Sequence, residues 1–227
     1  MLVPSLSGTV KRALFAGGTL VAAAATVVAL SGAIATAAPP ASSNSAAVPL
    51  PVPVTVNAGT TAYLVLDLTT AVCAPNPACV ATLPAVADSL AQARAAGALV
   101  VYSKTVTPGD QVMPQVAPLP TDPVVMAKAD KFLNTDLAQI LSSHGIKTVV
   151  IVGTKSNGAV MYTAYEANAR GYTAVVAEDG ISADTPFISR YSLFQLLNAP
   201  GFPNATNAPL AANAVTLSKT TMITFAG

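Results

Sequence analysis

The chain has 227 residues, of which 52% are hydrophobic and only 9% charged, and its formal net charge is +1. This composition is too apolar for a disordered chain, and the near-zero net charge offers no basic field to attract nucleic acid. Tryptophan is absent and aromatic residues make up 5%, which also argues against stacking platforms for bases. The length allows one generous domain or two small ones.

The N-terminal segment has the layout of a secretory signal peptide. Lys11 and Arg12 precede an apolar stretch over residues 13–33, which ends in the A-x-A cleavage pattern of residues 35–37. Cleavage there removes residues 1–37 and predicts a secreted or periplasmic protein. The apolar stretch is also long enough to span a bilayer, so an uncleaved N-terminal anchor is the alternative. We favour cleavage because the stretch is rich in alanine rather than leucine.

Strand-like and helix-like segments alternate along the rest of the chain. Residues 38–60 are rich in Pro, Ala and Ser and are predicted to be a linker, and the globular part is expected from Thr61 onward. Strands are expected at residues 63–66, 98–102, 149–152, 172–177 and 214–217, and helices at residues 83–96, 135–143, 158–169 and 185–197. The proline-rich stretch 108–123 cannot be helical and is a candidate lid or wall of an active site.

This alternation predicts a Rossmann-like α/β domain over residues 61–227, with three α/β/α layers around a mainly parallel sheet. Ligands of such sheets bind beyond the carboxyl ends of the strands. That rule selects three places: Asp67 after the first strand, the segment around Lys128, and the loop 153–158 after the central strand.

At these three places the sequence resembles the isochorismatase-like (cysteine hydrolase) superfamily, which includes isochorismatases, nicotinamidases and N-carbamoyl amide hydrolases. The segment YLVLDLTTAVC resembles the family's first strand with its aspartate, here Asp67, and VVMAKADKFLNTDLAQIL resembles the segment that holds the family's lysine. The third segment, GIKTVVIVGTKSNGAVMYTAYEANARGYTAVVAEDGIS, resembles the strand, loop and helix of the nucleophile and is the most specific of the three. The resemblance covers the chain from about Thr61 to the C-terminus.

The position of the nucleophile departs from the family pattern. Laying GTKSNGAVMYTA on the pattern G-x-x-T-x-x-C-V-x-x-T-A places Ser156 at the threonine and Ala159 at the cysteine. Alanine carries no nucleophile, so covalent catalysis of the amidase type is excluded at this position. The resemblance implies another chemistry, because some family members that cleave isochorismate also lack the cysteine and hydrolyse a vinyl ether by protonation and water attack.

Asp67 is the expected general acid or base, because a carboxylate directly after an apolar strand is costly to bury unless it is paired or used. A helix N-cap or a partner for a backbone amide is the alternative role. A lysine across from Asp67 would lower the pKa of the carboxyl, which suits a base and works against an acid. We predict Lys128 as this lysine, and Lys131, directly before Phe132, is the alternative register.

The loop before the last motif's helix is a second candidate site. Asn157 and Gly158 stand at the helix start, where free backbone N–H groups form an anion or oxyanion site; a plain Asn-Gly turn is the alternative. Ser156 is expected to contact the substrate from the same loop, but no histidine base can be placed beside it. The single histidine, His144, lies near a helix C-terminus and cannot supply the multi-histidine zinc site of the family's nicotinamidases. Neither a metal nor a cofactor is therefore expected.

The two cysteines, Cys73 and Cys79, stand six residues apart in CAPNPAC. In an exported protein this spacing predicts a disulfide, and a displaced nucleophile at Cys73 is the alternative.

The sequence thus predicts an exported isochorismatase-like hydrolase that acts on a small polar metabolite without a cysteine nucleophile. Its expected partner is a small-molecule substrate, with no nucleic acid and no membrane after signal cleavage, and a homo-oligomer is left open. A non-catalytic binding protein of the same fold is the alternative function.

Overall fold

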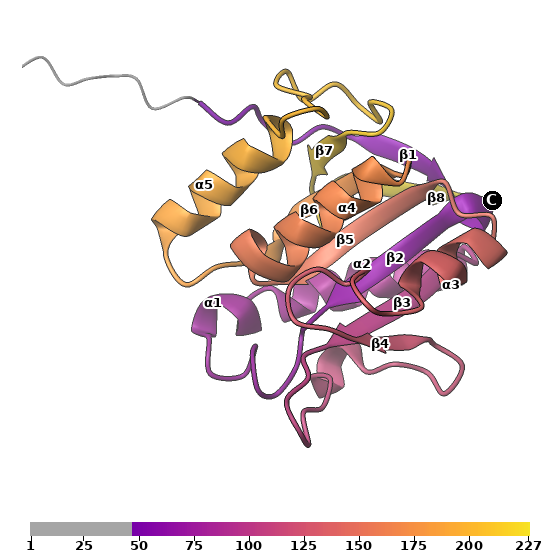
Figure 1. Ribbon diagram of the computed structural model, residues 1–227, viewed down its shortest axis with the longest axis vertical. Coiled ribbons are helices and arrows are strands. Elements are labelled where there is room, and N and C mark those ends of the chain that lie inside the picture. The colour runs from indigo at the N-terminus through magenta and orange to yellow at the C-terminus, as the bar shows by residue number, and fades with distance from the viewer. Residues whose placement is uncertain (1–46) are drawn as a thin grey trace, which may run out of the picture. The chain divides into compact units, whose positions relative to one another are not determined.

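A six-stranded parallel sheet carries the fold in the computed structural model, which describes residues 47–227 (Figure 1). The strand order is β4-β3-β2-β5-β6-β7, and all neighbouring pairs are parallel. The strands are β2 (Thr61–Leu66), β3 (Leu99–Lys104), β4 (Val124–Met126), β5 (Thr148–Thr154), β6 (Thr173–Ser182) and β7 (Val215–Ser218). The predicted parallel sheet is therefore confirmed.

Helices cover both faces of this sheet, as three α/β/α layers require. In Figure 1, α3, α4 and α5 lie in front of the sheet and α2 lies behind it. The helices are α1 (Pro77–Val80), α2 (Leu83–Ala95), α3 (Leu137–Ser143), α4 (Met161–Ala169) and α5 (Pro186–Leu197). Alternate side chains of β2 serve the two layers, because successive residues of a strand point to opposite faces: Tyr63 and Val65 join the core under α2, and Leu64 and Leu66 join the core under the other helices.

The domain begins earlier than the sequence predicts. Residues Val54–Asn57 form β1, which pairs in parallel with β8 (Ile223–Ala226), and Val54 and Val56 are buried in the core under α2. The predicted linker 38–60 therefore contains a strand, followed by a short 3₁₀ helix, η1 (Ala58–Thr60). The sequence hides the strand because only two alternating residues face the core. The predicted signal peptide, residues 1–37, lies outside the described residues.

The proline-rich stretch 108–123 holds a short 3₁₀ helix, η2 (Pro114–Val116), and its Met113 and Val116 are buried in the core under α2. The middle of this stretch is therefore fixed on the domain. Within residues 47–227, no helix combines the length and the apolar character that crossing a membrane requires.

Candidate active site

Asp67 stands at the carboxyl end of β2, where it is held between neighbouring strands. Its backbone adopts a φ of 51°, and the residue is buried. The Asp67 N–H donates to the carbonyl oxygen of Ser103 at the end of β3 (3.2 Å), and the Ser103 hydroxyl donates to Asp67 Oδ1 (2.7 Å). The carboxylate is thus oriented by β3, with its second oxygen left for another partner.

That partner is Lys131. Its Nζ lies 2.7 Å from Asp67 Oδ2, and the two side chains are 0% and 5% exposed for Lys131 and Asp67. The same ammonium donates to the carbonyl oxygens of Ala127 (2.9 Å) and Lys128 (2.7 Å). Three acceptors match the three N–H groups of an ammonium, so this buried charge is fully satisfied.

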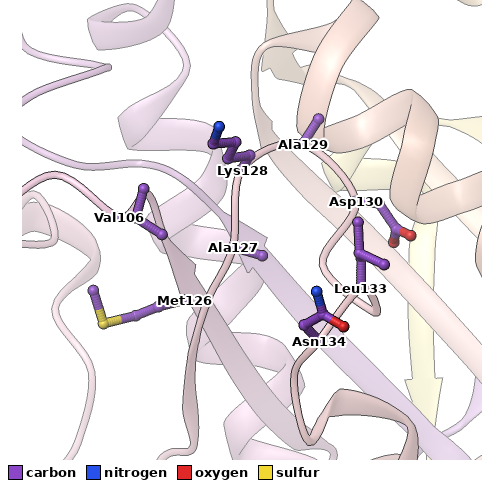
Figure 2. A pocket seen from close by; sticks show the side chains of 8 residues that line it. All are labelled: Val106, Met126, Ala127, Lys128, Ala129, Asp130, Leu133 and Asn134. Atoms are coloured by element: carbon purple, nitrogen blue, oxygen red, sulfur yellow. The ribbon is translucent and has the colours of Figure 1, made fainter.

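The prediction that Lys128 lies across from Asp67 is therefore wrong, and the alternative, Lys131, holds that place. Lys128 contributes its carbonyl oxygen to Lys131, while its side chain is exposed and lines a hollow together with Val106, Met126 and Leu133 (Figure 2). The chain from residue 127 to residue 131 turns around the Lys131 ammonium, so only Lys131 points inward. The sequence signal that could have selected Lys131 is its place directly before the buried Phe132.

Burial dominates the ionisation of this pair. It raises the pKa of Asp67 above 3.8, against the opposing effects of the Lys131 charge and of the hydrogen bonds from Lys131 and Ser103. Burial likewise lowers the pKa of Lys131, which Asp67 opposes. Asp67 therefore takes up a proton more readily than an exposed aspartate does, which suits a group that must exchange protons.

Ala159, the predicted position of the nucleophile, follows the adjacent strand β5. It lies in η3 (Ser156–Val160), a helical segment with a kink at Gly158 (φ −119°, ψ −110°), which leads into α4. Ala159 is buried, and Thr163 of α4 accepts a hydrogen bond from the Lys131 N–H (3.2 Å). Residues four apart share one face of a helix, so Ala159 belongs to the face that meets the lysine segment.

Two polar groups of this loop that were expected to face a substrate have partners within the domain. The Gly158 N–H donates to the carbonyl oxygen of Lys155 (2.9 Å), so it is not a free oxyanion donor. The Ser156 hydroxyl is buried and donates to the Ser192 hydroxyl of α5 (2.9 Å), so it joins the loop to α5 instead of facing a substrate. Asn157 is half-buried, and its predicted contact with a substrate remains a prediction.

The sequence of residues 61–203 matches the protein-family model of the isochorismatase domain. The chain belongs to the isochorismatase family. It is 29% identical over 138 residues to streptothricin hydrolase from Streptomyces noursei, and the match covers 56% of this chain and 51% of that protein. It is 27% identical over 115 residues to N-carbamoylsarcosine amidase from Arthrobacter sp., covering 47% of this chain and 44% of that one. The chain thus spans about half the length of these two hydrolases.

Solved structures of the isochorismatase family share the fold. A cysteine hydrolase from Pseudomonas syringae pv. phaseolicola superimposes with a TM-score of 0.62 at 21% identity, over 73% of this chain and 91% of that chain. N-carbamoylsarcosine amidase from Thermoplasma acidophilum superimposes with a TM-score of 0.56 at 23% identity, over 71% of this chain and 96% of that chain. At such identities the likeness establishes the architecture of this isochorismatase-family chain and not its substrate.

The predicted disulfide is confirmed. Cys73 and Cys79 are bonded, with their Cα atoms 5.2 Å apart, and both are buried. Since the chain contains only these two cysteines, neither supplies a free thiol to this isochorismatase-family site. His144 is exposed at the C-cap of α3, where its Nδ1 lies 2.8 Å from the carbonyl oxygen of Ile140, as expected for a surface residue at a helix end.

Proposed function

We propose that this chain is an exported isochorismatase-family hydrolase that acts on a small polar metabolite without a cysteine nucleophile. The observation that carries the proposal is the buried Asp67–Lys131 pair, complete in its hydrogen bonds, in a chain whose position for the family nucleophile, Ala159, bears only a methyl group. A buried ion pair stabilises a fold no better than apolar residues of the same size do. A use in catalysis accounts for a buried charge pair at the sheet edge where ligands bind.

The chemistry that suits the site is proton transfer followed by attack of water. For a vinyl ether, the Asp67 carboxyl gives its proton to the terminal carbon of the C=C bond and leaves an oxocarbenium ion. Water adds to the cationic carbon and returns one proton to the Asp67 carboxylate, and the resulting hemiketal breaks into a ketone and an alcohol. Lys131 stabilises the carboxylate between these steps, and the raised pKa of Asp67 favours the acid form that starts them.

Export is part of the proposal, supported by the signal-like residues 1–37 and by the disulfide, which is typical of proteins in oxidising compartments. N-terminal sequencing of the protein recovered outside the cytoplasm should begin at Ala38. Recovery of the chain in the membrane fraction with Met1 intact would instead support the N-terminal anchor.

The test of catalysis compares Asp67→Asn with Lys128→Ala. Isochorismate, simple amides and N-carbamoyl compounds are offered to the wild type, and the hydrolysed class is followed in both variants. Asp67→Asn should abolish turnover, because an amide cannot exchange the proton. Lys128→Ala should keep it, because the removed side chain is exposed and only the Lys128 carbonyl serves Lys131.

A non-catalytic binding protein is the second candidate, and it is favoured by Ala159, which removes the nucleophile at the position of the family's cysteine. In that case the wild type hydrolyses none of the three classes and binds a small acid, while Asp67→Asn changes only the affinity. This result would overturn the catalytic proposal.

A further inference from the structure

A cavity of about 320 Å³ opens at the carboxyl edge of the sheet, apart from the Asp67–Lys131 pair. Segments that follow three adjacent strands meet there. The lining residues are Ala71, Val72, Pro75 and Asn76 after β2, Lys155 after β5, and Asp184 after β6. Lys155 stands four residues before Ala159, so the cavity adjoins the loop that leads to the predicted position of the nucleophile.

The polar side chains of this cavity form a chain of contacts. The Lys155 Nζ lies 2.5 Å from Asp184 Oδ2, and Asn76 Nδ2 donates to Asp184 Oδ1 (3.3 Å). The lysine and aspartate side chains are 41% and 48% exposed, and an ion pair that faces solvent contributes little to stability. An ammonium has three N–H groups and a carboxylate about four acceptor positions. Both ions can therefore form hydrogen bonds to a ligand without destabilising the fold.

The segment of the cavity wall that carries Asn76 is held in place by a disulfide and by hydrogen bonds within the chain. Asn76 lies inside the loop closed by the Cys73–Cys79 disulfide, and its Oδ1 accepts hydrogen bonds from the N–H groups of Ala78 (3.0 Å) and Cys79 (3.4 Å) at the start of α1. A side chain held in this way loses little freedom on binding, which favours affinity.

We propose that this cavity binds the α-amino-acid end of a substrate, in which an ammonium and a carboxylate are attached to one carbon. The inference rests on the proposed function, since it assigns a substrate class to that hydrolase. A ligand with a single charge would meet one partner ion and one ion of its own sign. A zwitterion presents its carboxylate to Lys155 and its ammonium to Asp184, two groups that already lie in contact.

The test uses glycine as the probe, with acetate and methylammonium as singly charged controls, titrated calorimetrically into the full chain. Glycine should bind at least about tenfold more tightly than either control, because it makes charge-assisted hydrogen bonds at both ends. Lys155→Ala and Asp184→Asn should each weaken glycine about tenfold. Lys219→Ala is the matched control: it removes another partly exposed lysine, paired with Glu178 outside this cavity, and should leave glycine binding unchanged.

Three outcomes would overturn the inference: no saturable binding of glycine, acetate binding as tightly as glycine, or equal losses in Lys155→Ala and Lys219→Ala. The Asp67→Asn variant separates this inference from the proposed function. Its glycine affinity should match that of the wild type even where its turnover is lost. Hydrolysis without glycine binding would contradict only the zwitterion site. Glycine binding without hydrolysis would contradict only the proposed function.

Discussion

Gly153 of β5 lies against Leu66 of β2 so closely that a Cβ built on it would stand 2.0 Å from the Leu66 carbonyl oxygen. The two residues are register partners in the parallel pair, and Gly153 has a φ of 135°, in the region that favours glycine. Asp67 follows Leu66 directly. The close approach therefore brings together the ends of the strands that carry Asp67 and the loop toward Ala159.

We expect Gly153→Ala to destabilise the domain by more than a typical core substitution, about 3 kcal/mol or more, because the added methyl meets backbone atoms that cannot rotate away. Gly109→Ala is the control, since Gly109 also has a positive φ (75°) but has nothing within 4 Å of an added Cβ. Its cost should be about 1–2 kcal/mol. Urea unfolding measures the loss of unfolding free energy in both variants. Equal losses would show that the backbone conformation, and not the contact with Leu66, causes the destabilisation.

Removing one partner of the buried ion pair should destabilise the domain more than removing both charges. Replacing Asp67 and Lys131 together by Asn and Met removes both charges while keeping similar volumes, and it leaves the carbonyl oxygens of Ala127 and Lys128 without the Lys131 ammonium. Lys131→Met alone leaves an unpaired buried carboxylate and should be less stable than the double variant. The double variant should have no turnover. If it unfolds more easily than Lys131→Met, the unpaired carboxylate of Asp67 is not what destabilises the single variant.

The pH dependence of stability follows from the raised pKa of Asp67. A carboxyl whose pKa is higher in the folded than in the unfolded protein binds more protons when folded, so its contribution to stability is complete below pH 3.8 and is lost as the pH rises through the raised value. The amide of the Asp67→Asn variant cannot titrate. The unfolding free energy of the wild type minus that of Asp67→Asn should therefore decrease from about pH 4 upward and then level off. A difference that increases with pH would mean that the Lys131 charge outweighs burial.

The sequence predicts the elements whose own composition and periodicity are distinctive. The apolar, β-branched run of residues 149–152 predicts β5, and the alternation of strands and helices predicts the parallel sheet. The sequence does not reveal β4, since this three-residue edge strand has an exposed residue on each side of Val125. Nor does it reveal β1 and β8, which pair with each other although they lie at opposite ends of the domain's sequence.

The same limit applies to the site. Asp67 was predictable because a buried strand ends in a carboxylate, and the disulfide because two cysteines share a short loop. The choice between Lys128 and Lys131 depends on the path of an irregular segment, which no periodicity describes. The hydroxyl of Ser156 is committed to Ser192, 36 residues further along the chain, and such a contact is invisible before the helices pack.

Ala159→Cys should give a thiol with a pKa below the ordinary value of about 8.5, because the N-terminus of α4 stabilises a thiolate. The two native cysteines are bonded to each other, so the new thiol is the only one that iodoacetamide can alkylate. The midpoint of the alkylation rate against pH, followed by mass spectrometry, gives the thiol pKa even if burial slows the reaction.

Ala169→Cys is the matched control for that measurement, because Ala169 is exposed at the opposite end of α4, where the helix dipole disfavours an anion. Its midpoint should lie at or above about 8.5. In Ala159→Cys combined with Asp67→Asn, the midpoint should not rise, because the neutral amide lacks the negative charge that disfavours a nearby thiolate. Weak amide hydrolysis by Ala159→Cys, absent from the wild type and from the double variant, would follow from the same arrangement. Equal midpoints for Ala159→Cys and Ala169→Cys would show that the site no longer activates a nucleophile, and that its Asp67–Lys131 pair serves binding instead.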